Sequence, residues 1–518
     1  MTFVPSKYQE EIYKFVHDGH GSAVVIAVAG SGKTTTIIEA LPLIPRAQSV
    51  RLFAFNNAIA TELKSRIQQK GAMHAQASTF HSIGFRAVCQ HLGLRHIETQ
   101  SRKLSQLFRL NMRSHLRAYE APICKLVSLA KGTGIGALFP DNVESWKELI
   151  RHHEIDVEID DGLAIQLARQ LLELSNAAAR DEYLIDFDDH LYLPCLWELE
   201  LPKHDWVIVD EAQDTNAIRR AFIGKSMKEN GRLLAVGDPC QAIYGFTGAS
   251  VDAIELIKND WDAIELPLSV SYRCPRHVVR LAKTLVPYIE PAEGASEGKV
   301  SRRSVSAIFD GEFGQEDAVL CRTNAPLVGL AYECIGRGIS CRILGRDIGK
   351  GLVTLVERLN PQNIDDLELR LTEYEHREVA KFLQREEHGK AANVTDRVQC
   401  LFTIIENLPE EQRTVQGLIQ ALDTLFGDEI GPRLTLSTVH KAKGKEWRSV
   451  AILEPGLMPA GWARSAWQQQ QERNLQYVAW TRARETLVFL EGGKAPWYGN
   501  ALIDHLDVVE EDDELEVP

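Results

Sequence analysis

Short apolar runs rich in valine and isoleucine recur along the chain, and polar or glycine-rich residues follow each of them. Residues 22–28 form the first run, which predicts a buried strand of a parallel sheet. Residues 206–209 and 232–236 predict two more strands in the first half. In the second half the runs lie at residues 318–321, 434–437, 450–453 and 487–490. Helical stretches separate these runs, so the pattern indicates an α/β protein with parallel sheets flanked by helices.

Two long stretches between the predicted strands have helical composition, at residues 86–185 and 351–431, and the second is strongly charged. In the first, Arg109, Arg113 and Arg117 are spaced four residues apart. A continuous helix would align them in one stripe. Such a stripe either follows nucleic-acid phosphates or is a solvated helix face.

The composition is that of a globular protein with several domains, since 518 residues exceed one ordinary core. No apolar run is long enough to cross a bilayer, and no apolar signal core follows Met1, so we expect a cytoplasmic protein. The nine cysteines form no C-x-x-C pair. We expect reduced thiols, without a zinc or iron–sulfur site.

The formal net charge of −14 is unevenly distributed. Residues 507–518 carry seven acidic residues and no lysine or arginine, which is half of that charge. This stretch is typical of a solvated tail, and a hook for a partner or a mimic of nucleic acid is the alternative. The acidity does not exclude a nucleic-acid partner, because binding needs only a local basic track.

A glycine-rich turn, residues 29–34 (Ala-Gly-Ser-Gly-Lys-Thr), follows the first predicted strand and precedes a helical stretch. Strand, glycine-rich turn and helix are the context of a phosphate-binding loop, whose backbone N–H groups surround phosphate oxygens. Lys33 would supply charge to the β and γ phosphates, and Thr34 a hydroxyl to Mg²⁺. Ala27 stands where the common pattern has its first glycine. A purely structural glycine turn is the alternative.

Two adjacent carboxylates, Asp210 and Glu211, follow the strand predicted at residues 206–209. Asp210 can hold Mg²⁺, and Glu211 is placed to polarise an attacking water. Gln241, after the next strand, could sense a γ-phosphate through its amide. Tyr244 and Phe246 follow in a glycine-rich segment and could stack on nucleic-acid bases, or could belong to the core.

The motifs form an ordered series over about residues 5 to 490 that resembles superfamily 1 helicases of the UvrD/Rep/PcrA type. Residues 7–9 resemble the Q motif, and residues 27–34 and 210–214 resemble motifs I and II. The other matching stretches are residues 53–60 (Ia), 78–81 (Ib), 237–249 (III), 268–274 (IV), the strand-end signature 321–325, 436–447 (V) and 477–483 (VI). Thr35 stands where the family usually has an arginine, and Phe246 where it has a tryptophan.

The resemblance implies two RecA-like P-loop NTPase lobes with helical insertions. Lobe 1A would comprise residues 1–85 and 186–262, and insertion 1B residues 86–185. Lobe 2A would comprise residues 263–350 and 432–500, and residues 351–431 would be a reduced 2B-like insertion. The tail of residues 501–518 lies outside the resemblance.

The resemblance also implies roles for single residues. Gln9 would read adenine, Tyr272 would stack on it and Glu446 would lie near the ribose, while Arg273 and Arg482 would reach the γ-phosphate. The expected nucleotide-binding set is Gln9, Ala29, Gly30, Ser31, Gly32, Lys33, Thr34, Thr35, Tyr272 and Glu446. The expected catalytic set is Lys33, Glu211, Gln241, Arg273 and Arg482, with Thr34 and Asp210 as ligands of Mg²⁺. The expected nucleic-acid contacts are Phe55, Asn57, Thr79, His81, Tyr244, Phe246 and His440.

From this resemblance we expect a DNA helicase that hydrolyses ATP between its lobes and moves 3′→5′ on single-stranded DNA, with or without a junction to duplex. The second insertion is much shorter than the family's 2B domain. This favours, as the alternative, a translocase that does not unwind, or a nucleotide-gated subunit of a larger complex. A partner nuclease, or a repair, replication or defence factor, is compatible with either.

Overall fold

The computed structural model describes residues 4–153, 160–243, 252–384, 388–427 and 433–491. The chain divides into two compact units, Met1–Ser269 and Val270–Pro518. Within the described ranges, no helix has both the length and the apolar character needed to span a membrane.

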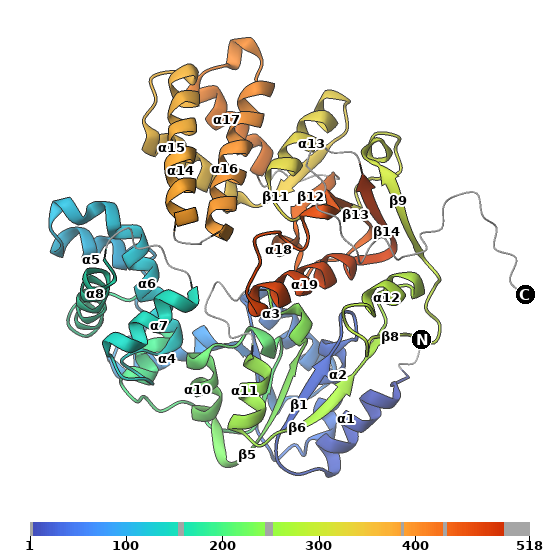
Figure 1. The fold of residues 1–518 in the computed structure, drawn as a ribbon. Helices are drawn as coiled ribbons and strands as arrows, with labels where there is room; N and C mark the ends of the chain where they lie inside the picture. Colours follow the sequence, from blue (N-terminus) through green and yellow to red (C-terminus); the bar gives the residue numbers. More distant parts are fainter. Residues whose placement is uncertain (1–3, 154–159, 244–251, 385–387, 428–432, 492–518) are drawn as a thin grey trace, which may run out of the picture. The chain divides into compact units, whose positions relative to one another are not determined.

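The first unit is built on a six-stranded sheet in the order β3-β2-β4-β5-β1-β6, and every neighbouring pair is parallel. Its strands are β1 (Ala23–Ala27), β2 (Val50–Ala54), β3 (Ala75–Thr79), β4 (His204–Val209), β5 (Met227–Gly237) and β6 (Ile264–Leu268). Figure 1 shows β5, β1 and β6 with helices on either side. The sheet contains the three strands predicted for this half of the chain.

Both faces of this sheet are buried, because alternate side chains of a strand point to opposite faces. Val25 and Leu52 pack in one core with helices α1 (Lys7–Asp18), α2 (Lys33–Ala40) and α3 (Asn57–Gln69). Val24 and Phe53 pack in the other core. The helices of that second face are α4 (Phe80–His91), α9 (Asp189–Leu196), α10 (Ala217–Lys225) and α11 (Ala253–Asp260).

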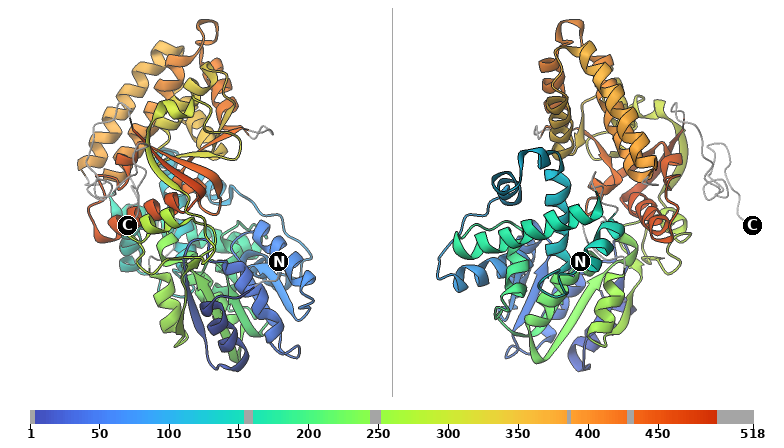
Figure 2. Two further views of the ribbon diagram at one scale, coloured as in Figure 1. Left: turned by 90° about the vertical axis from the view of Figure 1, so that its right-hand side faces the viewer. Right: turned by 60° about the vertical axis from the view of Figure 1, so that its left-hand side comes forward.

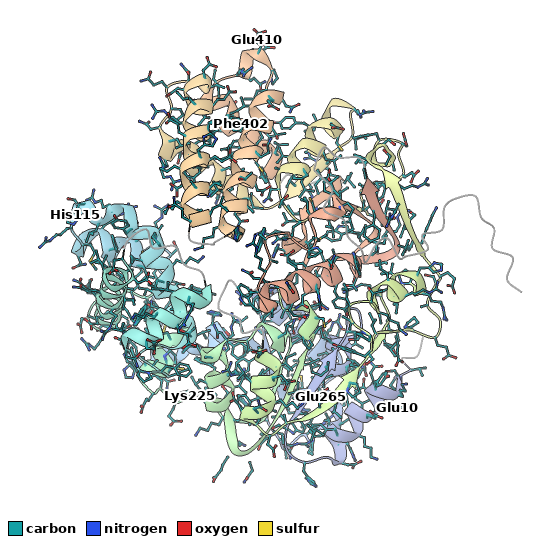
Figure 3. The ribbon with its side chains drawn as sticks, in the orientation of Figure 1. Glu10, His115, Lys225, Glu265, Phe402 and Glu410 are labelled. Carbon is teal, nitrogen blue, oxygen red and sulfur yellow. The ribbon has the colours of Figure 1, made fainter. Side chains whose placement is uncertain are left out.

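The first insertion consists of helices that share the second core with the sheet. They are α5 (Lys103–Asn111), the 3-10 helix η2 (Ser114–Tyr119), α6 (Glu120–Thr133), α7 (Val143–His153) and α8 (Asp161–Asp181). Figure 3 labels His115 of η2 in this insertion. The remaining short 3-10 helices in the described part of the unit are η1 (Leu41–Leu43), η3 (Ala212–Asp214) and η4 (Pro239–Gln241).

The predicted arginine stripe in this insertion is wrong. Helix α5 ends at Asn111, and the backbone is extended at Met112 and Arg113, so Arg109 and Arg113 do not lie on one helix. The extended residues break the four-residue repeat on which the stripe depended. Arg109 Nε instead donates to Glu120 Oε2 at 2.7 Å.

The second unit is built on another six-stranded, all-parallel sheet in the order β11-β12-β10-β13-β14-β9. Its strands are β9 (Lys299–Ser304), β10 (Ala318–Cys321), β11 (Cys341–Leu344), β12 (Leu434–Thr438), β13 (Trp447–Leu453) and β14 (Ala483–Glu491). A small sheet pairs β7 (Val270–Ser271) with β8 (Glu290–Pro291). The other elements are α12 (Arg276–Ala282), α13 (Ala325–Gly336), α18 (Val439–Ala442), α19 (Ala466–Trp480), η6 (Val305–Ile308) and η8 (Pro455–Leu457).

The second insertion is a group of four helices whose core is continuous with that of the second sheet. They are α14 (Arg346–Leu359), α15 (Ile364–Gln384), α16 (His388–Asn407) and α17 (Val415–Phe426), with the 3-10 helix η7 (Glu410–Gln412) before α17. These helices lie side by side in both views of Figure 2. Figure 3 labels Phe402 on α16, and Glu410 at the outer end of the connection to α17.

The α/β class with parallel sheets flanked by helices is therefore confirmed in both units. The expected start of the second lobe at residue 263 differs from the structure. Strand β6 pairs with β1 and completes the first sheet, and the second unit begins at Val270. The exposed Ile264 and Glu265 gave β6 no continuous apolar signature, because it is an edge strand.

Candidate functional site

The glycine-rich turn between β1 and α2 forms a cradle at the start of a helix. Gly30 and Gly32 have φ values of 72° and 78°, in the left-handed region that glycine adopts without strain. This conformation turns successive backbone N–H groups toward one side, where the helix dipole also favours an anion. Ser31 Oγ is buried and has no hydrogen-bond partner in the described part of the chain. The cradle and the unsatisfied hydroxyl fit a bound phosphate.

Lys33, the first residue of α2, contacts the carboxylate that follows β4. Its Nζ lies 2.8 Å from Glu211 Oε2. Burial lowers the pKa of Lys33, but the charges of Glu211, Asp210 and Asp238 together outweigh burial and raise its pKa above the ordinary value. The ammonium is therefore held charged beside the cradle.

Asp210 lies at the end of β4 beside the second residue of α2. Thr34 Oγ1 donates to Asp210 Oδ2 at 3.2 Å. Burial, and then the neighbouring Glu211, raise the pKa of Asp210 to about 6. A hydroxyl and a carboxylate side by side are oxygen donors of the kind that Mg²⁺ takes together with phosphate oxygens. The donor set fits that ion.

Glu211 adopts a left-handed backbone conformation with φ 54°, which is uncommon outside glycine and costs conformational energy. Gln213 Nε2 donates to Glu211 Oε2 at 2.6 Å. Gln213 Oε1 in turn accepts from the backbone N–H of Asp238 at 3.0 Å. A Cβ on Gly237 would lie 2.6 Å from Gln213 Oε1, so a side chain there would displace the Gln213 amide. Gln213 thus orients Glu211, a role that its place in the sequence did not predict.

Gln241 lies in η4, directly after β5. Its Nε2 donates to Asp238 Oδ2 at 2.6 Å, and its side chain is buried. Burial raises the pKa of Asp238 to about 6. Asp238 thus contacts the amide of Gln241 while its own backbone contacts Gln213, so both glutamines are held at the end of β5.

Gln9 lies on α1 beside the start of α2. Its Oε1 accepts from the backbone N–H of Ser6, completing a capping box, and its Nε2 donates to Thr36 Oγ1 at 2.9 Å. The amide therefore bonds within the chain at both ends. Thr35 is half-buried on the same helix α2.

A second group of residues in the first unit surrounds a cavity of about 330 Å³. Phe55 and His81, both predicted to contact nucleic acid, line it together with Phe187 and Arg219. His81 stacks on Phe187 with ring centroids 3.9 Å apart, and the Arg219 guanidinium lies 4.9 Å from the centre of the Phe55 ring. Phe187 is 57% exposed, which is unusual for so large an apolar side chain. Phe187 lies between Asp186 and Asp188 in the sequence, and nothing in this pattern predicted a functional role for it.

Phe187 stands between residues of a buried ion-pair network. Lys131 Nζ lies 2.7 Å from both Asp186 and Asp189, and Lys103 Nζ lies 2.6 Å from Asp189. Lys103 and Lys131 belong to helices α5 and α6 of the first insertion, whereas Asp189 starts α9. Removing one partner of such a network leaves a buried charge unpaired. The network therefore fixes the insertion to the segment that carries Phe187.

Two more predicted nucleic-acid residues lie at helix starts. Asn57 is the exposed first residue of α3. Thr79 is buried, and its hydroxyl caps α4 by accepting from the backbone N–H of Ser82 at 3.1 Å. Tyr244 and Phe246 lie outside the described residues.

In the second unit, Arg273 and Glu446 lie together. Arg273 Nε donates to Glu446 Oε2 at 2.5 Å, and Nη1 donates to the Thr481 carbonyl at 3.5 Å. Tyr272, the residue predicted to stack on adenine, is 50% exposed. Arg273 and Glu446, both predicted for the nucleotide, are thus in direct contact, and Tyr272 precedes Arg273 in the chain.

Arg482, by contrast, is buried. Its Nε donates to the Val478 carbonyl at 2.8 Å, Nη1 to the Lys445 carbonyl at 3.2 Å and Nη2 to Thr481 Oγ1 at 3.1 Å. His440, on α18, is neutral, because burial, and then Arg322, lower its pKa to about 3. These three bonds of the Arg482 guanidinium all go to backbone and hydroxyl oxygens of its own unit.

Comparison with protein families gives two matches along the chain. Residues 8–262 match the UvrD/REP helicase N-terminal domain, and residues 354–491 match the UvrD-like helicase C-terminal domain.

Curated relatives include the ATP-dependent DNA helicase Rep of Buchnera aphidicola, 24% identical over 51% of this chain and 41% of that protein. DNA helicase II of Haemophilus influenzae is 26% identical over 51% of this chain and 38% of that protein. The ATP-dependent DNA helicase UvrD2 of Mycobacterium tuberculosis is 25% identical over 90% of this chain and 75% of that protein. The chain thus spans about two fifths of the length of the first two relatives.

Proposed function

The chain belongs to the UvrD/Rep helicase family, and from this premise we propose that it is an ATP-driven motor that moves 3′→5′ along single-stranded DNA. One observation carries the proposal. The lysine of the glycine-rich turn, its neighbouring threonine and the two carboxylates after β4 converge on one cradle, at distances of 2.8 and 3.2 Å. This is the set of groups that phosphoryl transfer from ATP to water requires.

The Lys33–Glu211 ion pair suggests how nucleotide binding prepares hydrolysis. In the proposed cycle, the β and γ phosphates of ATP take Lys33 away from Glu211. Glu211 stays oriented by Gln213 and becomes free to accept a proton from the attacking water. Thr34 and Asp210 would hold Mg²⁺, which supplies positive charge to the phosphate oxygens.

Arg273 and Arg482 have the charge expected of groups that stabilise the transferring phosphate. In the proposed cycle they act on the nucleotide that the first unit binds, with Tyr272 on the adenine and Glu446 near the ribose. Binding of ATP would then favour a closed arrangement of the two lobes and hydrolysis an open one, which is a ligand-driven population shift. Arg273 is paired with Glu446, so it would have to exchange this partner for the phosphate.

DNA binding is proposed for the cavity of the first unit. Phe55, His81 and Phe187 present aromatic surface on which bases stack without regard to sequence. His81 is neutral there, because burial, and then Arg219, lower its pKa to about 3. It therefore offers a ring face rather than a charge. Asn57, Thr79, Tyr244, Phe246 and His440 complete the proposed nucleic-acid contacts.

A translocase that does not separate strands is a second candidate. It is favoured by the second insertion, whose four helices share one core with the second sheet. The insertion is therefore too small to form a large domain of its own. A partner nuclease, or a repair, replication or defence factor, would then supply the remaining activity. A nucleotide-gated subunit with little turnover is the third.

The first experiment measures ATP hydrolysis with and without single-stranded DNA, using the full chain and its Glu211→Gln variant. Strong stimulation that the variant loses supports a DNA-dependent motor. Absence of stimulation by any single strand contradicts the motor and favours the nucleotide-gated subunit. Displacement of a strand from a duplex with a 3′ single-stranded end then separates a helicase from a translocase, and a matching 5′ end tests polarity.

A further inference from the structure

A second cavity, of about 490 Å³, lies at the outer edge of the first sheet. Strand β3 is the last strand on this side and pairs with β2 alone in the part of the chain that the structure describes. The cavity follows β3 between α3 and α4. Its polar lining comes from Arg51, Lys64, Gln68, Gln76 and Arg86, with the 76% exposed Met73 beside them.

Arg51 is a buried cation at the base of this cavity. It is only 7% exposed, and its guanidinium donates to His204 Nε2 at 3.1 Å, Ser78 Oγ at 3.3 Å and Gln76 Oε1 at 3.1 Å. His204 is neutral, because burial, and then Arg51, lower its pKa to about 4. All three acceptors are therefore uncharged.

The cations of this edge lack ion-pair partners in the described part of the chain. Among the described residues, no carboxylate forms an ion pair with Arg51, Lys64 or Arg86. Burial, and then the neighbouring Arg86, lower the pKa of Arg51, so the cations act on one another. A buried cation normally has an anionic partner, because desolvating an unpaired charge is costly. The cavity therefore fits an anionic ligand.

The backbone beside the cavity favours one kind of anion. An edge strand leaves alternate N–H and C=O groups without a ladder partner, and an extended peptide can pair with them. The cavity also lies at the entry half of the sheet's edge, at the second residue of β2 and of β3. The ATP and DNA groups instead follow the carboxyl ends of the strands, at Phe55, Thr79 and Asp210.

We propose that this edge binds an acidic, extended segment of a partner protein, which adds a strand beside β3 and places its carboxylates against Arg51, Lys64 and Arg86. The charge fixes the composition of the segment and the free edge fixes its conformation. The inference rests on the first unit alone and does not depend on the proposed motor activity.

The test uses the full chain and a fluorescent synthetic peptide of about ten residues with alternating valine and glutamate, which is the length of one long strand. Its control is the same peptide with glutamine in place of glutamate. We expect anisotropy titration to show binding of the glutamate peptide alone, weakening as salt rises. The Lys64→Gln/Arg86→Gln double variant should lower the affinity about tenfold, since each exposed charge contributes up to about fivefold.

A matched variant controls for net charge. Lys14→Gln/Arg46→Gln removes one exposed lysine and one exposed arginine elsewhere in the first unit and should leave the affinity unchanged. Amide hydrogen exchange should slow at residues 75–79 when the peptide binds, which side-chain ion pairing alone would not produce.

Several outcomes would overturn the proposal. Equal binding of the glutamine peptide removes the role of charge, and unchanged exchange at residues 75–79 removes strand addition. Loss of single-stranded DNA affinity in the Lys64→Gln/Arg86→Gln variant, with DNA displacing the peptide, would make the edge a nucleic-acid surface. Binding only to a chain that lacks residues 501–518 would make this chain's own acidic stretch the occupant.

Discussion

Both sheets place a glutamate in the same unusual backbone conformation within two residues of the end of a central strand. Glu211 follows β4 with φ 54°, and Glu454 follows β13 with φ 50°. Glu211 meets Lys33 at 2.8 Å and Gln213 at 2.6 Å. For Glu454, no side chain in the described ranges donates a hydrogen bond, and burial raises its pKa.

The difference shows that the strand-end turn is a property of the fold, whereas the chemistry comes from what faces the turn. In the first unit the facing element is the glycine-rich turn, with its cradle and lysine. In the second unit a cation instead meets another glutamate, because Arg273 pairs with Glu446. The two sheets therefore supply different halves of the proposed ATPase: binding and water activation on one, arginine charge on the other.

The largest effect is expected in the first unit, which is proposed to bind ATP and activate the attacking water. Lys33→Ala removes the charge expected on the β and γ phosphates and leaves Glu211 and Asp210 without their cation. We expect ATP turnover to fall by at least about 10³-fold. Steady-state phosphate release checks this, with the exposed Lys14→Ala as the control. Turnover near that of the unaltered chain would contradict the assignment of the cradle.

Variants of Arg482 test the arginine charge that the second unit supplies. What matters is whether they lower nucleotide binding or turnover. Removal of an arginine that acts only on the transferring phosphate should spare nucleotide binding and cost about 10³–10⁵ in turnover. Because Arg482 is buried and holds three oxygens, Arg482→Lys is measured beside Arg482→Ala to preserve packing. Binding of a fluorescent nucleotide and kcat are the two readouts. A loss of nucleotide binding with unchanged kcat would mean that Arg482 contacts the bound nucleotide without stabilising the transition state.

The two glutamates can be compared directly. Glu211→Gln should lower kcat by about 10²–10⁴, the usual contribution of a general base. Glu454→Gln, in the same backbone conformation but without an ion pair among the described residues, should change kcat by less than about threefold. The measurement is DNA-stimulated ATP hydrolysis of both variants side by side. Equal losses would mean that the shared turn, rather than the facing lysine, decides the function.

A smaller effect is expected at the cavity of the first unit. Phe187→Ala removes an exposed ring that stacks on His81, and base stacking on aromatic side chains contributes about 1–3 kcal/mol per base. We therefore expect the affinity for single-stranded DNA to fall about 5- to 150-fold, with basal ATPase unchanged. Phe139→Ala, an exposed phenylalanine of the same unit outside this cavity, is the control. An unaltered affinity would remove Phe187 from the DNA contacts.

The smallest effect compares the stability of the two units against pH. His81 in the first and His440 in the second both have a pKa near 3, lowered by burial and then by Arg219 and Arg322 respectively. The unfolded chain binds these protons below about pH 6.5, so stability is lost as pH falls. At pH 5.5, each histidine should lower the free energy of unfolding by about 1.4 kcal/mol. Thermal unfolding at pH 7.5 and 5.5 should show a flatter dependence for His81→Asn and His440→Asn but not for the exposed His20→Asn.

Much of this molecule could be predicted from local sequence. The apolar runs at residues 22–28 and 206–209 gave strands, because burial on both faces of a parallel sheet selects continuous β-branched residues. Gly30 and Gly32 gave the cradle, because only glycine turns that way without strain. The ordered motifs gave the family, which the family matches confirm.

Contacts between distant segments could not be predicted in this way. The chain of contacts from Glu211 through Gln213 to Asp238 depends on β4 and β5 lying side by side. The arginine stripe failed because two extended residues ended a helix where the spacing continued.

The sequence by itself determined the strands, the phosphate cradle and the order of the motifs, since each depends on residues adjacent in the chain. Only the tertiary structure decided that Phe187 stacks on His81 and that Arg51 is buried at a sheet edge. It also decided that, among the residues it describes, no carboxylate pairs with Arg51 and no cation pairs with Glu454. The physical reason is the distance along the chain between the residues that interact. Backbone conformation and burial periodicity are set over a few residues, whereas the charge and stacking partners of a side chain are set by segments that meet only when the sheets assemble.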